Sequence, residues 1–381
     1  MSSSPKPFKL NVSSELLDWV TDRVNTARVI PDLTHPVGKE WDDGVPTSVI
    51  EPLVAYWRTT YDWKKMEKRI NETFKMFTVD LEEAGETISL HFVHHRSERK
   101  DALPLIFAHG WPGNFTEVEH ILKLTAPEDP KAQAFHVVAP SIPGFTLSSS
   151  PTKPGFGISK MASVYYKLMN VLGYERFVGQ GGDWGSFILR SLALQYPSCL
   201  IGLHINFIVT LPPKPLRNPI TLFWLATRQK NAIFLKEENG YSKIQGTKPQ
   251  TISYMATDED FVWDADVIIT WTMLYLISCS AGNARIYKEG NSESDGTSML
   301  LGSKISKEVA IGVSSFPKDV GYATKWWAEA TLAENIITWK EHPKGGHFPS
   351  LECPDEWVQR IRETTSPAKW EELLKAGRPK L

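Results

Sequence analysis

The sequence predicts an α/β fold, with a mostly parallel central sheet flanked by helices and a helical cap inserted into it. Apolar runs of strand length alternate with stretches of helical periodicity between residues 76 and 206. After Asn206 the alternation stops, and aromatic-rich helices and loops continue to about residue 301 before strand-like runs resume. Such alternation is typical of a doubly wound parallel sheet. The interruption predicts a cap carried by one core.

The expected elements follow in a simple order along the chain. Segment 1–74 contains two expected helices, ELLDWVTDRV (15–24), which Ser13 or Ser14 can cap, and TSVIEPLVAYWRTTY (47–61). Strands are expected at 76–81, 88–95, 103–110, 135–142, 176–182, 200–206, 309–316 and 335–342, and helices at 115–124 and 158–172. We therefore divide the chain into an N-terminal segment (1–74), a core (75–206 and 302–381) and a helical cap (207–301).

Composition and charge are those of an ordinary globular protein. The 381-residue chain is 41% apolar and 23% charged, and its formal net charge of −2 without a basic block does not indicate nucleic-acid binding. Its three cysteines, Cys199, Cys279 and Cys353, lie far apart without the spacing of a zinc site or a disulfide framework. We find neither a secretory signal nor a run of about 18 apolar residues. We therefore expect a cytoplasmic protein without a membrane anchor.

The stretch GQGGDWGSF (179–187) surrounds Asp183 with small residues between a predicted strand and a predicted helix. It fits the pattern small-x-nucleophile-x-small of the nucleophile elbow in α/β-hydrolases, with an aspartate at the nucleophile position. The tight turn needs small neighbours, and the N-terminus of the following helix favours a charged carboxylate. An aspartate that only caps the helix would fit the same turn, so the order of other residues along the chain has to decide.

Two residues further along the chain match the order nucleophile, acid, histidine of that fold. Asp319 in SSFPKD and His347 in KGGHFPSLE each follow one of the resumed strands, at the edge where parallel sheets collect their functional groups. This order favours Asp183, Asp319 and His347 as a catalytic triad. As an alternative, Asp319 would also fit as the cap of a helix in VGYATKWWAEA.

The loop FAHGWPGN (107–114) closes the third predicted strand of the core. In α/β-hydrolases this loop donates one backbone N–H to the oxyanion hole, and the residue after the nucleophile donates another. These two residues are Trp111 and Trp184. Pro112 makes the peptide bond before it a candidate for the cis isomer.

An aspartate nucleophile limits the chemistry of the site. Attack of a carboxylate on an ester gives an anhydride, whereas attack on an sp³ carbon gives an alkyl ester that water can cleave. The substrate should therefore carry an epoxide C–O or a C–halogen bond, and the chain has no G-x-S-x-G motif. Ring opening also needs a proton donor, and a tyrosine, with a pKa of about 10, can supply the proton. Tyr241 and Tyr287 in the cap are candidates, although each would also fit as a packing residue.

The motifs HGWPG, PSIPGFTLSS, QGGDWGS, GYSKIQGTKPQT, ARIYKE, FPKD and KGGHFPSLE occur together in this chain. The combination resembles the microsomal-type epoxide hydrolases, especially soluble fungal members, over nearly the whole sequence. The resemblance implies an α/β-hydrolase fold in which the N-terminal segment wraps the core. It also implies an apolar epoxide and water as substrates, a vicinal diol as product, and no cofactor.

The resemblance assigns a role to each candidate residue. Asp183 matches the nucleophile that forms a hydroxyalkyl ester, and His347 and Asp319 match the pair that activates the hydrolytic water. Tyr241 and Tyr287 match the ring-opening acids. Trp111 and Trp184 match the residues of the oxyanion hole.

The chain departs from the family's pattern after GTKPQT. Relatives usually continue through a longer helical stretch, whereas ISYMATDEDFVWDADVIITW is shorter here, which leaves the size of the substrate open. Cap aromatics suggest an apolar substrate but are also typical of a helical core; they are Phe223, Trp224, Trp263 and Trp271. The sequence also leaves open whether the protein is a homodimer, and whether it serves detoxification or biosynthesis.

Three alternatives would use the same fold. A haloalkane dehalogenase also has an aspartate nucleophile and can carry a tryptophan directly after it, as Trp184 is here, but it does not need a tyrosine pair. A cyclase would open an epoxide with an internal hydroxyl group and use much of the same acid–base apparatus. A non-catalytic ligand-binding relative is the third, and the complete set of catalytic residue types argues against it.

Overall fold

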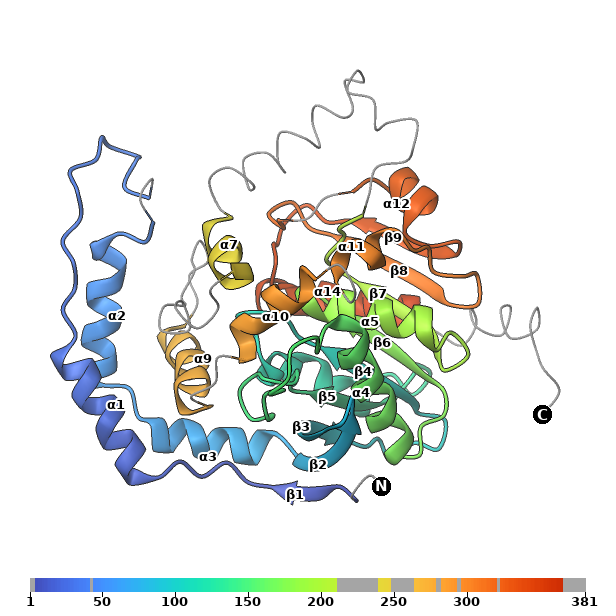
Figure 1. Ribbon diagram of the computed structural model, residues 1–381, viewed down its shortest axis with the longest axis horizontal. Helices are drawn as coiled ribbons and strands as arrows, with labels where there is room; N and C mark the ends of the chain where they lie inside the picture. Colours follow the sequence, from blue (N-terminus) through green and yellow to red (C-terminus); the bar gives the residue numbers. More distant parts are fainter. Residues whose placement is uncertain are drawn as a thin grey trace.

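The apolar runs of the chain assemble into a single sheet. In the computed structural model, which describes residues 4–41, 44–210, 239–247, 264–278, 282–292, 296–320 and 323–365, nine strands pair in the order β1-β2-β3-β5-β4-β6-β7-β8-β9 (Figure 1). They are β1 (Lys6–Phe8), β2 (Met76–Glu83), β3 (Glu86–His95), β4 (Leu103–Ala108), β5 (Phe135–Pro140), β6 (Phe177–Gly181), β7 (Leu200–Ile205), β8 (Ala310–Ser315) and β9 (Ile336–Glu341). Strands β4 to β9 run parallel, and β1, β2 and β3 form an antiparallel edge. The predicted α/β-hydrolase sheet is therefore confirmed.

All eight strands expected from the sequence are present, and β1 is an additional one. It pairs antiparallel with β2, with Phe8 opposite Met76. Its three residues are too few to show the period-2 pattern by which the other strands were predicted.

Helices cover both faces of the sheet. One face carries α4 (Ile158–Val171), α5 (Asp183–Gln195) and α12 (Lys325–Thr331), and the other carries the 3₁₀ helix η1 (Phe115–Thr125), α13 (Pro349–Glu352) and α14 (Pro354–Thr364). Side chains of β4 alternate between the two cores, since Leu105 and Phe107 pack on the second face and Ile106 and Ala108 on the first. The continuous apolar runs follow from this, because a strand that is covered on both sides has no polar face.

The helix expected at 115–124 is a 3₁₀ helix rather than an α-helix. Its fully buried side chains Phe115, Val118, Ile121 and Leu124 recur every third residue. This spacing matches the three residues per turn of a 3₁₀ helix, so these four side chains form one apolar row against the sheet.

The N-terminal segment contributes three helices, α1 (Ser14–Thr26), α2 (Thr47–Thr59) and α3 (Trp63–Thr73), of which α3 was not expected. Of the two candidate caps of α1, Ser13 is the one observed, because its Oγ accepts a hydrogen bond from the Leu16 N–H at 3.3 Å. Val20 of α1 and Trp63 and Ile70 of α3 belong to the core on the second face of the sheet. The segment thus packs along one side of the molecule (Figure 1).

Four described helices lie between β7 and β8 in the chain: α7 (Gly240–Thr247), α9 (Ala265–Ser278), α10 (Gly282–Gly290) and α11 (Thr297–Leu301). The N-terminal segment is bonded to α9, since Tyr56 Oη donates to Asp266 Oδ1 at 2.9 Å and the hydroxyls of Tyr61 and Thr270 lie 3.0 Å apart. Within the described ranges no single helix is long and apolar enough to cross a membrane, although α9 and α10 pass that test together as a bent pair.

Some expectations for the cap lie outside the described residues. They concern residues 211–238 and 248–263, which include Phe223, Trp224, Trp263 and most of the stretch that is shorter than in relatives. The boundaries 1–74, 75–206, 207–301 and 302–381 stay a prediction.

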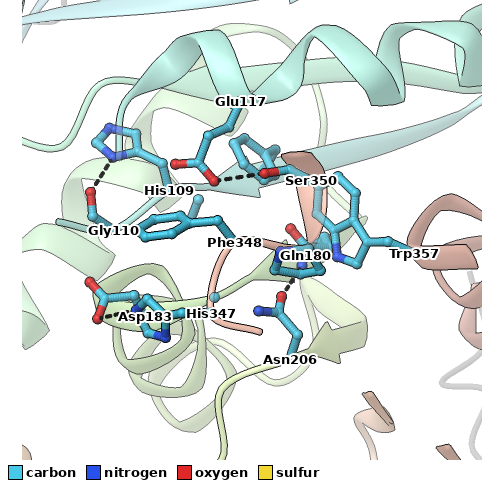
Figure 2. Close-up of a pocket in the computed structure, with 14 residues that line it drawn as sticks. His109, Gly110, Glu117, Gln180, Asp183, Asn206, His347, Phe348, Ser350 and Trp357 are labelled. Atoms are coloured by element: carbon cyan, nitrogen blue, oxygen red, sulfur yellow. Dashed lines mark hydrogen bonds and ion pairs between the residues drawn. The ribbon is translucent and has the colours of Figure 1, made fainter. Parts of the chain in front are cut away.

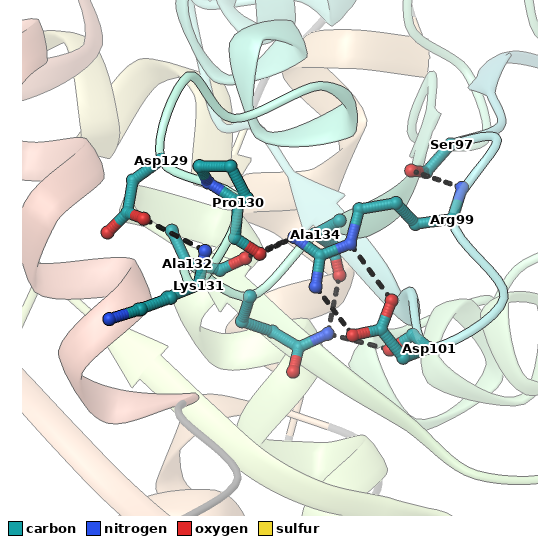
Figure 3. A network of polar contacts seen from close by, with 9 residues as sticks. Ser97, Arg99, Asp101, Asp129, Pro130, Lys131, Ala132 and Ala134 are labelled. Carbon is teal, nitrogen blue, oxygen red and sulfur yellow. Dashed lines mark hydrogen bonds and ion pairs between the residues drawn. The ribbon is translucent and has the colours of Figure 1, made fainter.

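A polar network joins the connections at the amino ends of β4 and β5 (Figure 3). Arg99, just before β4, binds Asp101 through its Nε at 2.9 Å and donates from Nη1 to the carbonyl oxygens of Pro130 and Ala132 at 3.0 and 2.7 Å. Because β4 and β5 are parallel, this network lies at the sheet edge opposite the carboxyl ends, and it fixes the scaffold rather than a site.

The turn between β6 and α5 brings the first turn of that helix very close to β4. A Cβ at Gly185 would lie 2.0 Å from the Ala108 carbonyl oxygen and 2.7 Å from that of His109. Real Cβ atoms do not approach backbone so closely, so only glycine allows α5 to start here.

We therefore predict that Gly185→Ala lowers the free energy of unfolding by about 2–4 kcal/mol, because helix and strand must separate to admit the methyl group. The matched control is Gly302→Ala at the end of α11, where the nearest heavy atom would be 3.5 Å from the new Cβ. Chemical denaturation of both variants measures the difference. Equal stability of the two variants would contradict the prediction.

Candidate active site

Asp183 begins α5 in a left-handed conformation, with φ of +43°. Its Oδ1 accepts a hydrogen bond from the backbone N–H of Trp111 at 2.7 Å, so the carboxylate is turned towards the loop after β4. The N-cap of α5 is Gly182, and the helix has no side-chain cap. Asp183 is therefore not a helix-capping residue, which was the alternative to a nucleophile.

The loop after β4 is shaped to receive this carboxylate. A Cβ at Gly110 would lie 2.2 Å from Asp183 Oδ1, so a side chain at this position would displace the carboxylate. Burial lowers the pKa of His109 to about 4. The neutral ring donates from Nδ1 to the Gly110 carbonyl at 2.9 Å and accepts from the Ile142 N–H at Nε2, 3.2 Å. The peptide bond between Trp111 and Pro112 is cis.

His347 joins Asp183 to Asp319. Its Nε2 lies 3.2 Å from Asp183 Oδ2, and its Nδ1 lies 2.7 Å from Asp319 Oδ1. The Val320 N–H also donates to Asp319 Oδ1 at 2.7 Å. Thr324, not Asp319, caps the following helix α12, so the capping alternative for Asp319 does not apply. The Asp319 side chain is almost wholly buried, with 2% of it exposed.

The electrostatics of this triad favour a charged imidazole. Burial lowers the pKa of His347, but the negative charge of Asp319 and the hydrogen bonds to Asp183 and Asp319 outweigh it and hold the pKa well above its ordinary value. At neutral pH His347 is therefore an imidazolium between two carboxylates, since an opposite charge at hydrogen-bond distance favours the charged form.

Two cap helices bring the tyrosines together over the same loop. Tyr241 of α7 stacks on the Trp111 ring, with centroids 5.4 Å apart, and meets the Tyr287 ring edge-on at 5.8 Å. Tyr287 of α10 lies edge-on to both Trp111, at 5.7 Å, and Trp184, at 4.9 Å. Burial, and next the charge of Asp183, raise the pKa of Tyr287 well above its ordinary value, so its hydroxyl keeps its proton.

Aromatic side chains also surround the histidine. Phe207 and Phe348 lie edge-on to the His347 ring at 5.3 and 5.0 Å, and Trp271 lies edge-on to Phe348 at 5.8 Å. Among the described residues no group of three His, Cys, Asp or Glu side chains is arranged to hold a metal ion. The seven residues singled out from the sequence thus belong to one connected region, Asp183, His347, Asp319, Tyr241, Tyr287, Trp111 and Trp184.

Comparison with known proteins agrees with this geometry. Residues 5–118 match the family model described as epoxide hydrolase N terminus, and residues 104–221 match the alpha/beta hydrolase fold. A protein of Stigmatella aurantiaca (strain DW4/3-1), named "Putative epoxide hydrolase", is 32% identical over 386 residues, which cover 94% of this chain and 84% of that relative. The chain belongs to the epoxide hydrolase family.

Other epoxide hydrolases support the assignment. Epoxide hydrolase 1 of Sus scrofa is 29% identical over 418 residues, covering 94% of this chain and 88% of the pig protein. The solved structure of Aspergillus niger epoxide hydrolase superposes with a TM-score of 0.82 at 27% identity, covering 96% of this chain and 97% of that one. The resemblance to epoxide hydrolases drawn from the motifs is confirmed, and so is the expectation of an enzyme.

This epoxide hydrolase also buries a carboxyl group that was not among the residues singled out from the sequence. Glu117 of η1 is 7% exposed, and its Oε2 accepts a hydrogen bond from Ser350 Oγ at 3.1 Å (Figure 2). Burial raises the pKa of Glu117 to about 8. The residue lies within a predicted amphipathic helix, where a glutamate normally faces solvent, so no motif pointed to it.

We predict that Glu117 makes the stability of the epoxide hydrolase depend on pH. Its folded-state pKa is above the unfolded value of about 4.3, so the folded state holds the proton more tightly. The stabilisation is complete below that value and is lost as pH rises towards 8, by several kcal/mol at most. Thermal melts of wild type and Glu117→Gln between pH 5 and 8 measure it: the midpoint of wild type should fall relative to that of the variant. Parallel curves for the two proteins would contradict this.

Proposed function

We propose that the enzyme converts a small apolar epoxide to a vicinal diol through a hydroxyalkyl ester on Asp183, which water activated by His347 and Asp319 then hydrolyses. The main support is the environment of one carboxylate. Its Oδ1 is hydrogen-bonded by the Trp111 amide, and its Oδ2 faces the histidine. An aspartate held by two other segments rather than by its own helix is suited to react with a ligand.

In the first step, Asp183 attacks an oxirane carbon with Oδ2, which gives up its 3.2 Å contact with His347 Nε2, while Oδ1 keeps the shorter hydrogen bond from the Trp111 N–H at 2.7 Å. The C–O bond of the ring breaks, and the oxygen takes a proton from Tyr241 or Tyr287. Both tyrosine rings pack against Trp111, and the raised pKa of Tyr287 keeps its hydroxyl protonated until the alkoxide forms. Positioned proton donors of this kind contribute about 10²–10⁴ in rate.

Esterification also changes His347 from an acid into a base. The free enzyme has a carboxylate at Asp183 beside an imidazolium, and the ester has neither charge at position 183 nor the hydrogen bond that raised the pKa of His347. The imidazolium then loses its proton more easily. The proton leaves His347 and passes to the tyrosinate, which had given its own proton to the substrate oxygen. The ester therefore stands beside a neutral imidazole.

In the second step, His347 Nε2 takes a proton from water, whose oxygen adds to the carbonyl carbon of the ester. The Trp111 and Trp184 amides are suited to stabilise the oxyanion. The Trp111 N–H already donates to Asp183 Oδ1, and Trp184 is in the first turn of α5, where backbone N–H groups have no partner within the helix. The bond between the carbonyl carbon and the substrate oxygen breaks, and the diol oxygen takes a proton from His347. The new acid proton of Asp183 returns to His347, which regenerates the ion pair.

The nature of the substrate follows from the surroundings of the reacting groups. The rings of Trp111 and Trp184 pack around Tyr287, and those of Phe207 and Phe348 lie edge-on to His347, so the surroundings of the reacting groups are mainly apolar. An apolar epoxide, for example one bearing an aryl group, would bury its hydrocarbon part against them. The cysteine spacing supports action in the reducing environment of the cytoplasm.

We predict that His347→Gln accumulates the ester. Glutamine leaves the nucleophile in position but cannot take a proton from water, so ring opening proceeds and hydrolysis stops. Intact-mass spectrometry after mixing with styrene oxide should show one added substrate mass, and none in the double variant Asp183→Ala, His347→Gln. A His347→Gln protein without adduct, from a preparation whose wild type makes diol, would rule out the covalent route. Single turnover of wild type in ¹⁸O-water should label Asp183.

We also predict that the two tyrosines share the acid role. Tyr241→Phe and Tyr287→Phe should each slow ester formation about tenfold, and the double variant about a thousandfold, because one hydroxyl partly replaces the other. Tyr196→Phe is the control, since that ring stacks on Tyr166 at 3.9 Å and does not contact the candidate site residues. Stopped-flow measurement of ester formation gives the rates. A double variant no slower than either single one would contradict the shared role.

A further inference from the structure

A small cavity lies directly beside Asp183 and His347 (Figure 2). It extends from these two residues to the carboxyl ends of β4 and β6 and to the first turns of η1 and α14. The polar side chains that line it, apart from the catalytic pair, are His109, Glu117, Gln180, Asn206, Ser350 and Trp357. Neither Tyr241 nor Tyr287 lines the cavity, so it is separate from the part of the site that these two tyrosines form, here called the tyrosine side.

Three buried polar atoms of this lining have no protein partner within the part of the chain that the structure describes. They are Glu117 Oε1, Gln180 Oε1 and Trp357 Nε1. The side chains that carry them are 7%, 0% and 1% exposed, respectively. Other atoms of the same side chains are satisfied, since Gln180 Nε2 donates to Asn206 Oδ1 at 2.8 Å and Glu117 Oε2 accepts from Ser350. Three such atoms in one small space call for a common ligand, because buried polar groups are nearly always paired.

The three atoms match the hydrogen-bonding capacity of water. The indole N–H only donates, the amide oxygen only accepts, and a carboxyl group can do either according to its protonation. Water has two O–H groups and two lone pairs, so it can accept a bond from the indole N–H or the protonated carboxyl group, donate one O–H to the amide oxygen, and keep its second O–H for His347. The space between the side chains has room for about one water molecule, and buried waters typically make about three hydrogen bonds to groups that otherwise lack partners.

The charge balance also favours a neutral ligand. Burial raises the pKa of Glu117 to about 8, so the group is mostly an uncharged acid at neutral pH. The two charged groups of the lining, the Asp183 carboxylate and the His347 imidazolium, are already paired with each other at 3.2 Å, so neither a cation nor an anion would find an unpaired opposite charge there.

We propose that Glu117, Gln180 and Trp357 hold an ordered water in this cavity, and that this water is the one that hydrolyses the ester at Asp183. The inference rests on the proposed covalent mechanism. The water lies on the side of the catalytic pair away from Tyr241 and Tyr287, so it stays in place while the epoxide occupies the tyrosine side. His347 takes one of its protons, its oxygen adds to the ester carbonyl carbon, and bulk water refills the cavity after the diol leaves. Glu117, Gln180 and Trp357 are thus positioning residues for the second step only.

The test separates the two chemical steps. Trp357→Phe removes the indole N–H, and Gln180→Met removes the amide oxygen together with the Nε2 that donates to Asn206 Oδ1; both variants keep most of the packing. Single-turnover stopped flow with styrene oxide should show ester formation within about threefold of wild type and ester hydrolysis slowed about tenfold or more by loss of a hydrogen bond to the reacting water. In the steady state both variants should therefore carry more covalent adduct in intact-mass spectra than wild type does.

The matched control is Tyr165→Phe. Its hydroxyl is also buried without a partner among the described residues, but it lies on α4, outside the cavity, so both steps should keep their rates. Glu117→Gln, which retains a polar group of the same shape, should slow hydrolysis less than Glu117→Met. If Trp357→Phe does not fold, the hydrolysis rates of Gln180→Met, Glu117→Gln and Glu117→Met still test the water site.

The outcomes distinguish this inference from the mechanism on which it rests. Hydrolysis at the wild-type rate in Gln180→Met and Glu117→Met, with His347→Gln still trapping ester, would overturn the water site alone. Equal slowing of both steps would show a general structural effect and would also overturn it. Absence of ester in His347→Gln would overturn the covalent scheme first.

Discussion

The hydrogen bond from the Trp111 amide to Asp183 is the contact on which the rest of the site depends. It turns the carboxylate away from its own helix and towards the histidine, and it exists only because three segments approach closely. Gly110 leaves space for the carboxylate, Gly185 lets α5 start against β4, and Asp183 itself adopts a left-handed conformation. Packing of the backbone thus determines where the charge lies, and the chemistry follows from that position.

In the same region, some buried titratable groups are charged and others are neutral, according to whether an opposite charge is in contact. Asp319 is almost wholly buried and His347 is half-buried, and their contact at 2.7 Å favours the charged form of both groups. Glu117 and His109 are buried without an opposite charge in contact and are held neutral instead. The site therefore combines a charged line of three groups with neutral polar groups beside it.

The sequence predicted most of the fold and of the candidate site because both leave local patterns. Strand runs, the small residues around Asp183 and the order of Asp319 and His347 are all visible in a single chain. What escaped prediction lacks such a pattern. β1 is too short to show a periodic pattern. The apolar residues from Phe115 to Leu124 recur every third position, and a sequence with this spacing does not distinguish a 3₁₀ helix from an α-helix. The cavity lined by Gln180 and Trp357 joins residues far apart in the chain, and only the folded structure brings them together.

The N-terminal segment acquires a different significance from its contacts with α9. Tyr56 and Tyr61 are hydrogen-bonded to Asp266 and Thr270 in the first half of that helix. In its second half, the Tyr275 hydroxyl donates to the Gly113 carbonyl at 2.7 Å. Gly113 lies two residues from Trp111, whose amide donates to the Asp183 carboxylate. Through α9 the N-terminal segment is thereby connected to the loop that binds the Asp183 carboxylate.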